Sequence, residues 1–320
     1  MAAPPRRPPS TAYAYRRAGT DDLVACAGIW RDSINDYTRR LNQPDIPDDL
    51  AAVIRLYTHL QACDPDGFVV AERAGGDGEP PAVVAFAASV RRETLWFLSM
   101  LFVLPDVQAG GLGRALLGQV MPPPGDAVLA TCTDAAQPIS NGLYASLGMA
   151  PRMPLVRLVG IPERDGHLAP LPSGISAVRF DDLDEAARAH LDDELAVLDR
   201  SAAGFAHPQD HDFVRAEGRI GVLFIDGAGA AIGYGYASEA GRVGPIAVRD
   251  AQILGPVVGH LVTTVIPRGA FGIWMPGDAG EAMTALLRSG FRLEGFPCLV
   301  CWDRPIADFS RYVPISPGLL

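Results

Sequence analysis

The chain has 320 residues, a formal net charge of −10 and 48% hydrophobic residue types, a composition typical of a globular protein long enough for two domains. All 27 positively charged residues are arginines, which excludes a Walker-type phosphate loop and a pyridoxal Schiff base, because both require lysine. No apolar run reaches the roughly 18 residues of a membrane span, and an acidic chain without a basic run argues against nucleic-acid binding.

The first eleven residues, 1–11, are rich in proline where a signal peptide would need an apolar core. We therefore expect a short disordered tail on a cytoplasmic protein. An element pattern follows that the chain repeats once. Its first copy predicts, in chain order, a strand at 15–17, a helix at 20–37, an extra helical segment at 47–63, a hairpin of 67–73 with 82–90, a strand and helix over 94–121, a strand at 127–132, a helix at 135–147 and a final strand.

The second copy repeats this order without the extra helical segment. It predicts a strand at 176–179, a helix at 181–200, a hairpin of 220–226 with 230–238, a strand and helix over 242–266, a strand at 270–275, a helix at 278–289 and a final strand. The join at 161–174 is rich in proline and glycine and is predicted to be a linker. We expect an α/β fold, built on mixed sheets (α+β), with two domains at 12–160 and 175–320. Each would be a mixed, mostly antiparallel sheet flanked by helices.

A glycine-rich turn links the strand and helix of 94–121, with the sequence Gln108-Ala109-Gly110-Gly111-Leu112-Gly113. Glycine in the first turn of a helix costs stability relative to alanine, so a gain is expected in return. Bare N–H groups at a helix N-terminus bind anions such as phosphate, and glycine lets the ligand come close to the backbone. A dinucleotide-binding turn would need Gly-x-Gly-x-x-Gly directly after the strand, a spacing that this turn does not have.

Two motifs of the first copy resemble those of one enzyme family. Gln108-x-x-Gly111-x-Gly113 is similar to the signature Gln/Arg-x-x-Gly-x-Gly/Ala of the GCN5-related N-acetyltransferases. The stretch from Gly142 to Met149, GLYASLGM, resembles the family's Leu-Tyr-x-x-x-Gly-Phe and follows at the usual distance. The resemblance covers residues 12–160, and the second copy resembles the same family mainly by its order of elements.

This resemblance implies acetyl-CoA, or another acyl-CoA, as cofactor and a small-molecule amine as acceptor. It places Tyr144 as the general acid that protonates the leaving thiolate. The residues it assigns to cofactor binding are Leu101, Phe102 and Val103 at the strand end, Gln108, Ala109, Gly110, Gly111, Leu112, Gly113 and Arg114 in the turn, and Gln137 and Asn141 before the tyrosine. No metal is implied, no nucleic acid or membrane is expected as a partner, and the oligomeric state stays open.

A general base is missing from the expected place. Members of the family that deprotonate their amine directly often carry a glutamate in the strand before the turn, but residues 96–100 contain no acid. Glu93 and Asp134 can act through water or can be solvated charges at strand ends. Cys132 is either a core cysteine or a site of acyl transfer. Two other functions therefore remain open: an acyl-CoA decarboxylase or thioesterase, and a non-catalytic acyl-CoA-binding regulatory protein.

The second copy has lost the residues of this chemistry. Asp250 would bring negative charge to the equivalent phosphate turn, and Leu286 or Leu287 replaces the tyrosine. We therefore expect a non-catalytic domain. It carries −7 of the net charge, and the acids of 181–194 either attract a cationic acceptor or simply solvate a helix.

Two smaller motifs are interpreted as structural. His207 and His211 have a spacing found in metal sites, but no third ligand is apparent nearby, so a solvated helix start is the favoured interpretation. Cys298 and Cys301 are three residues apart on a predicted strand and would face opposite sides of it. We expect core cysteines there, without a disulfide or a shared metal.

Overall fold

The computed structural model describes residues 13–75, 79–108, 110–163 and 165–320. Packing divides the chain into two compact units. The first runs to Arg91 and resumes over Trp96–Ala127, and the second holds Arg92–Leu95 and Val128–Leu320. The domains at 12–160 and 175–320 were defined by the repeated sequence pattern instead, and their bounds remain a prediction.

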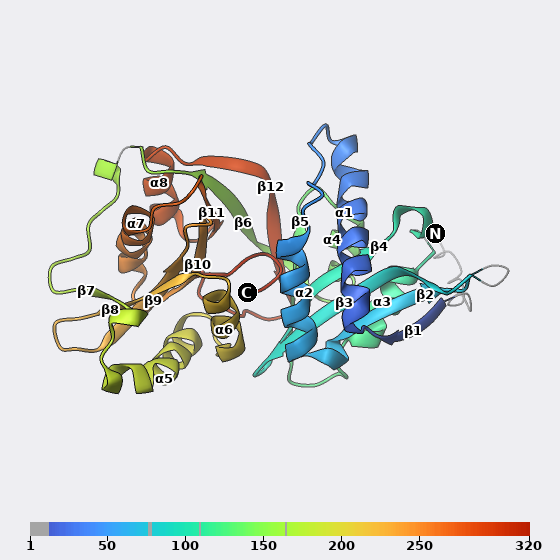
Figure 1. The fold of residues 1–320 in the computed structure, drawn as a ribbon, viewed down its shortest axis with the longest axis horizontal. Coiled ribbons are helices and arrows are strands. Elements are labelled where there is room, and N and C mark those ends of the chain that lie inside the picture. Colours follow the sequence, from blue (N-terminus) through green and yellow to red (C-terminus); the bar gives the residue numbers. More distant parts are fainter. Residues whose placement is uncertain (1–12, 76–78, 109, 164) are drawn as a thin grey trace. The chain divides into compact units, whose positions relative to one another are not determined.

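The first unit is a sheet with the strand order β1-β2-β3-β4 and helices on both faces (Figure 1). Tyr15 of β1 lies opposite Ala71 of β2, and Val70 of β2 lies opposite Phe86 of β3, both pairs antiparallel. Its elements are β1 (Tyr13–Arg17), α1 (Leu23–Arg40), α2 (Ala51–Cys63), β2 (Phe68–Arg73), β3 (Ala82–Arg92), β4 (Leu95–Val103) and α3 (Leu112–Val120), with 3-10 turns at Thr20–Asp22, Pro65–Gly67 and Pro105–Val107.

Aromatic residues hold α2 against this sheet. The buried Tyr57 of α2 meets Phe68 and Phe86 edge-on, with ring centroids 5.9 and 5.3 Å away. Such edge-to-face pairs contribute about 0.5–1.5 kcal/mol beyond the area they bury. The segment predicted at 47–63 therefore forms part of the first unit's core.

The second unit has a longer sheet, with the order β5-β12-β6-β11-β10-β9-β8-β7 and β13 paired to β10. Only β10 and β11 pair in parallel among the strand pairs described, so the sheet is mixed and mostly antiparallel, as predicted. Its elements are β5 (Val128–Asp134), α4 (Pro138–Ala145), β6 (Ala150–Gly160), β7 (Ser176–Arg179), α5 (Glu185–Ala202), α6 (Pro208–Ala216), β8 (Ile220–Ile225), β9 (Ala231–Ala237), β10 (Arg242–Val248), α7 (Leu254–Thr264), β11 (Phe271–Pro276), α8 (Gly280–Arg288), β12 (Arg292–Trp302) and β13 (Tyr312–Val313), with 3-10 turns at Asp165–His167, Phe180–Asp182 and Ala251–Ile253.

The final strands of the two copies are exchanged. β12, which ends the second copy, pairs with β5 of the first copy, so that Val300 lies opposite Cys132. β6, which ends the first copy, pairs with β11 of the second, with Leu158 opposite Ile273. β6 and β12 also pair with each other. Figure 1 shows these two long strands lying side by side. The periodicity of each copy predicts these strands but carries no information about which strand each one joins.

The second copy contains a helix that the sequence analysis left out. α6 begins at Pro208, directly after His207, and occupies the place in the order that α2 has in the first copy. The expectation that only the first copy has an additional helical segment is therefore wrong. A proline at the first helical position is a common start signal, but α6 has only nine residues and its charged side chains hide the apolar period.

A close contact between a glycine and an aromatic ring tests this packing. A Cβ added to Gly221 of β8 would lie 2.3 Å from two ring carbons of the buried Phe180. We expect Gly221→Ala to lower the free energy of unfolding by about 1–3 kcal/mol, the usual cost of overpacking. Urea denaturation followed by circular dichroism measures the change. Gly269→Ala is the control, since its Cβ meets no atom within 4 Å, and equal midpoints for the two variants would contradict the packing described.

Candidate functional site

The glycine turn leads directly into α3 in the first unit. Gly111 precedes the helix with φ of 82° and ψ of 4°, a left-handed conformation that costs an L-residue roughly 1 kcal/mol or more. The helix then runs from Leu112, which is buried together with Leu116 and Leu117. The N–H groups in the first turn of a helix have no carbonyl four residues earlier to bond. The start of α3 therefore has the geometry of an anion site.

The turn is fastened to the end of β4. The Val103 carbonyl accepts hydrogen bonds from Gln108 Nε2 and from Ser33 Oγ of α1, each 2.9 Å long. Leu101, Phe102 and Val103 are half-buried, whereas β4 up to Met100 is buried. The side chain of Gln108 thus has a structural task, holding the turn against the strand. The resemblance had assigned this residue to cofactor binding alone.

Packing does not require a glycine at every position of the turn. A Cβ on Gly113 would meet only Val103 Cγ2, at the ordinary distance of 3.7 Å, and one on Gly110 only the Val107 carbonyl, at 4.0 Å. Gly111 has no atom of the described residues within 4 Å of its Cβ position, and the backbone conformation is what requires a glycine there. Space for a ligand is therefore left beside the described part of the turn. Ala109 lies outside the described residues.

The second motif forms α4 in the second unit. Tyr144 lies near the end of this helix and is 4% exposed. Burial raises its pKa, while a side-chain hydrogen bond with Thr131 acts in the opposite direction. The phenol therefore keeps its proton at neutral pH, which a general acid requires.

The two polar residues predicted beside the cofactor lie at the start of α4. Gln137 precedes the helix, and its carbonyl accepts a 2.8 Å hydrogen bond from Asn141 Nδ2. The same Nδ2 also donates to the Asp134 carbonyl, at 3.0 Å, which joins the helix to β5. Asn141 Oδ1 is buried and has no hydrogen-bond partner among the described residues. This oxygen remains able to accept from a ligand.

Comparisons with known proteins identify the fold. No protein-family model and no curated protein matches the chain, but solved structures do. A Pyrococcus horikoshii protein described as an acetyltransferase superposes with a TM-score of 0.71 at 14% identity over 100% of both chains. A GCN5-related N-acetyltransferase from Sphaerobacter thermophilus gives 0.59 at 15%, over 94% of this chain and 99% of its own. The chain has the fold of the GCN5-related N-acetyltransferases.

The tandem arrangement is confirmed as well. A tandem protein of this fold from the clavulanic acid biosynthesis pathway matches with a TM-score of 0.52 at 16% identity, over 92% of this chain and 99% of its own. Identities this low establish the fold alone. The prediction made from the glycine turn and the tyrosine motif is thus confirmed at the level of the fold.

In this acetyltransferase fold, the strand before the turn carries no acid. The other two candidate bases both form polar contacts within the protein. Glu93 forms an ion pair of 2.8 Å with Arg200. The carboxylate of Asp134 accepts the Ala136 N–H at 2.8 Å. Neither contact excludes a role through water, and no residue is assigned as the base. Burial raises the pKa of Cys132, which disfavours the thiolate needed for an acyl-enzyme.

The second copy of the acetyltransferase fold lacks the features of the first. At its equivalent turn Asp250 accepts the Gln252 N–H at 2.9 Å, so its carboxylate caps the 3-10 turn that precedes α7. In α8, Leu286 is buried and Leu287 is 41% exposed, and neither offers a proton. The acids expected along one helix are divided between the 3-10 turn at Phe180–Asp182 and α5.

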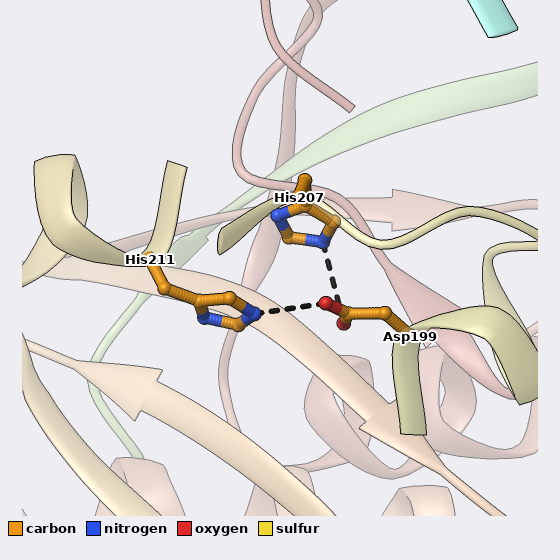
Figure 2. Close-up of side chains that lie close together, drawn as sticks. All are labelled: Asp199, His207 and His211. Atoms are coloured by element: carbon orange, nitrogen blue, oxygen red, sulfur yellow. Dashed lines mark hydrogen bonds and ion pairs between the residues drawn. The ribbon is translucent and has the colours of Figure 1, made fainter. Parts of the chain in front are cut away.

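The histidines at the start of α6 are not solvated. His207 is 0% and His211 1% exposed, so the interpretation as a solvated helix start is wrong. Both side chains point to Asp199 of α5 (Figure 2), a third residue that lies in a different helix and has no motif link to them. Of the two cysteines of β12, Cys301 is buried and Cys298 is half-buried, and both are free thiols. Among the described residues, no helix is both long and apolar enough to cross a membrane.

The backbone of the turn can be tested by two neighbouring substitutions. We expect Gly111→Ala to destabilise the first unit by about 1 kcal/mol, because alanine is strained at φ of 82°. Gly110→Ala should stay within about 0.5 kcal/mol of the parent, since Gly110 has neither a positive φ nor a close neighbour. Urea denaturation compares the two, and an equal loss in both variants would show that the turn differs from the one described.

Proposed function

We propose that the protein is an acetyl-CoA-dependent N-acetyltransferase that transfers an acetyl group to a small-molecule amine. The observation that supports this most is the turn before α3, with its left-handed Gly111, the hydrogen bond that joins Gln108 to Val103, and the open space beside Gly111. The fold itself carries acetyltransferases among its solved examples. The residues proposed for the cofactor are those predicted from the sequence.

The pyrophosphate of coenzyme A would lie on the backbone N–H groups at the start of α3. There the helix dipole favours negative charge, and Arg114 adds a positive side chain in the first turn. The Val103 carbonyl already accepts two hydrogen bonds, so the pantetheine amides would bond mainly to Leu101 and Phe102. The sequence analysis assigned Leu101, Phe102 and Val103 equally to cofactor binding, and this proposal gives Val103 a smaller part.

The acyl-CoA supplies a thioester whose carbonyl carbon the amine attacks. The new C–N bond forms, the C–S bond breaks, and the sulfur leaves as a thiolate that needs a proton. Tyr144 is proposed to give that proton from its hydroxyl, since burial keeps the phenol protonated. The amine must arrive neutral, and after the attack it loses one proton. Because β4 carries no acid to accept it, this proton passes to water and restores the hydroxyl of Tyr144.

Placing a charge at the helix start tests the cofactor site without a change in the fold. We expect Gly113→Glu to weaken acetyl-CoA binding by about tenfold or more, because its carboxylate competes with the pyrophosphate. The same carboxylate favours the helix N-terminus, and Val103 leaves room for its Cβ, so stability should be kept. Titration calorimetry with acetyl-CoA measures the affinity.

Gly118→Glu is the matched control for that experiment. It adds the same charge to the exposed face of α3, and its Cβ position is open. Affinity should be nearly unchanged in this variant. Equal affinities in the two variants would place the cofactor elsewhere, and no binding by the parent protein at millimolar acetyl-CoA would refute the proposed function.

Removing one hydroxyl tests the general acid. We expect Tyr144→Phe to lower kcat by about 100-fold or more, the usual contribution of a positioned acid, with little change in the affinity for acetyl-CoA. Tyr57→Phe is the control, because the Tyr57 hydroxyl is buried with no hydrogen-bond partner among the described residues. A screen of amines that follows release of free thiol gives the rates, and an unchanged kcat in Tyr144→Phe would remove this residue from the mechanism.

The absence of an acid in β4 favours a second candidate, an acyl-CoA thioesterase or decarboxylase that needs no amine base. The same assay separates the two functions when acetyl-CoA and malonyl-CoA are incubated with the protein alone. Thiol release without any amine would support the second candidate, and release only with an amine would exclude it. Binding without turnover under every condition would leave a regulatory acyl-CoA-binding protein.

A further inference from the structure

Three buried side chains of the second unit converge on one point (Figure 2). Asp199 comes from the last turns of α5, His207 precedes α6, and His211 lies in the first turn of α6. Their exposed fractions are 0%, 0% and 1%. A buried carboxylate is costly unless a positive charge or several donors compensate it. The site therefore needs a cation at this point, either a proton shared with histidine or a metal ion.

The distances match those between neighbouring ligands of one metal ion. His207 Nε2 lies 3.3 Å from Asp199 Oδ1, and His211 Nε2 lies 3.0 Å from Asp199 Oδ2. One ligand atom from each residue lies within 4.8 Å of the others. Metal bonds of about 2.0–2.2 Å at tetrahedral or octahedral angles place adjacent ligand atoms about 3.0–3.6 Å apart. The two imidazole rings are stacked, with their centroids 4.7 Å apart and their planes 12° from parallel. Both Nε2 atoms are directed to the carboxylate (Figure 2).

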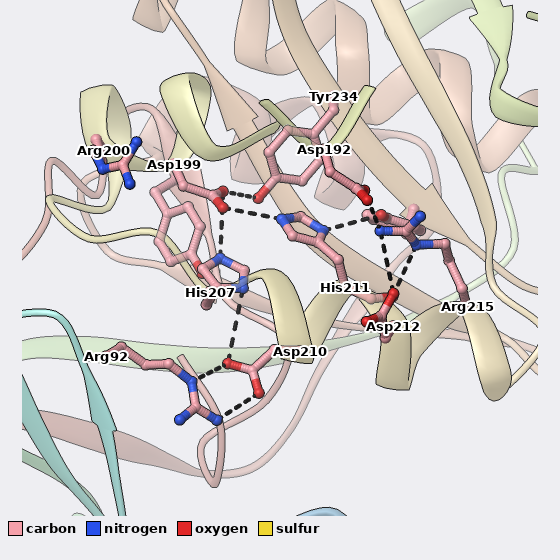
Figure 3. Close-up of polar contacts among 12 residues, drawn as sticks. Arg92, Asp192, Asp199, Arg200, His207, Asp210, His211, Asp212, Arg215 and Tyr234 are labelled. Atoms are coloured by element: carbon pink, nitrogen blue, oxygen red, sulfur yellow. Dashed lines mark hydrogen bonds and ion pairs between the residues drawn. The ribbon is translucent and has the colours of Figure 1, made fainter. Parts of the chain in front are cut away.

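Of the two remaining ring nitrogens, one has a hydrogen-bond partner and the other faces a carboxylate beyond hydrogen-bond distance. His211 Nδ1 lies 3.0 Å from the Tyr236 hydroxyl. His207 Nδ1 faces Asp210 Oδ2 at 3.9 Å, and Arg92 holds the Asp210 carboxylate through two bonds of 2.7 and 2.8 Å (Figure 3). Metal-ligating histidines commonly donate their second N–H to a carboxylate or another polar group, which fixes the ring.

A hydrogen-bonded network alone leaves one polar atom unsatisfied. His207 Nδ1 is buried and makes no hydrogen bond within the described residues. Among the described residues, its Nε2 has two long contacts, 3.3 Å to Asp199 and 3.3 Å to the Tyr312 hydroxyl. If His207 Nε2 bound a metal ion, the ring proton would lie on Nδ1. From there it could be donated to the Asp210 carboxylate. Because Arg92 already neutralises Asp210, the negative charge of Asp199 remains for the metal.

We propose that Asp199, His207 and His211 form a binding site for one divalent transition-metal ion, with Zn²⁺ as the expected occupant. Two imidazoles and a carboxylate are donors that zinc prefers. The Tyr234 hydroxyl donates to Asp199 Oδ1 at 2.5 Å and orients the carboxylate. Since the three ligands are fully enclosed, the ion would be structural and would hold α5 and the start of α6 on β9. This role is independent of acetyl transfer.

The first experiment uses the full-length wild-type protein. It is stripped with a chelator, dialysed against Zn²⁺ or Co²⁺, and analysed for bound metal by mass spectrometry. We expect one equivalent of either metal, and for Co²⁺ visible ligand-field absorption with the intensity of a four- or five-coordinate site. Chelation should lower Tm, and added Zn²⁺ should restore it. No retained metal, no Co²⁺ absorption and an unchanged Tm would overturn the proposal and leave a proton between Asp199 and His207.

Two variants locate the metal. His211→Ala and the more conservative Asp199→Asn should each lower Zn²⁺ affinity by tenfold or more and reduce the Co²⁺ spectrum. His190→Ala, on the exposed face of α5, is the matched control and should keep both. If a variant fails to fold, the chelation and Co²⁺ results on the wild type still decide. Retention of the full Co²⁺ spectrum in folded Asp199→Asn and His211→Ala would place the metal elsewhere and refute this site.

Discussion

The antiparallel pairing of β6 with β12 is the contact on which the architecture of the second unit depends. Each of these strands has a partner on both sides, so that β5, β12, β6 and β11 are joined by continuous backbone hydrogen bonds. Unpaired backbone groups in a sheet interior are costly. Because each copy of the pattern lends its last strand to the other, neither copy can close its own sheet alone. Both copies therefore have a structural role that does not depend on the phosphate turn or the tyrosine.

Asp250 and Leu286 of the second copy both have roles within the fold. Asp250 satisfies a local N–H group at the start of its turn, and Leu286 fills the core under α8. Both side chains are used within the protein, whereas the described residues leave open space at the Cβ position of Gly111.

Local features of the sequence predicted most of the elements and the fold. Gly111, the apolar period of α3 and the tyrosine motif act over a few residues, so a short window contains their signal. The strand exchange and the convergence of Asp199 with His207 and His211 depend on residues brought together by tertiary structure. No spacing rule relates them. The short helix α6 was missed for a related reason. Its buried face is made of Asp210, His211 and Val214, and in the sequence a buried face with polar residues cannot be told from a solvent-exposed one.

The exchanged strands also affect how the chain can be made. β5 is complete once residue 134 has been synthesised, but its partner β12 ends at Trp302. Through the intervening translation, that edge of β5 has no native neighbour from its own chain. An open strand edge can pair with other chains, and domains that fold during synthesis are exposed to such misassembly. Until the last strand leaves the ribosome, the edge of β5 is therefore open to pairing with other chains.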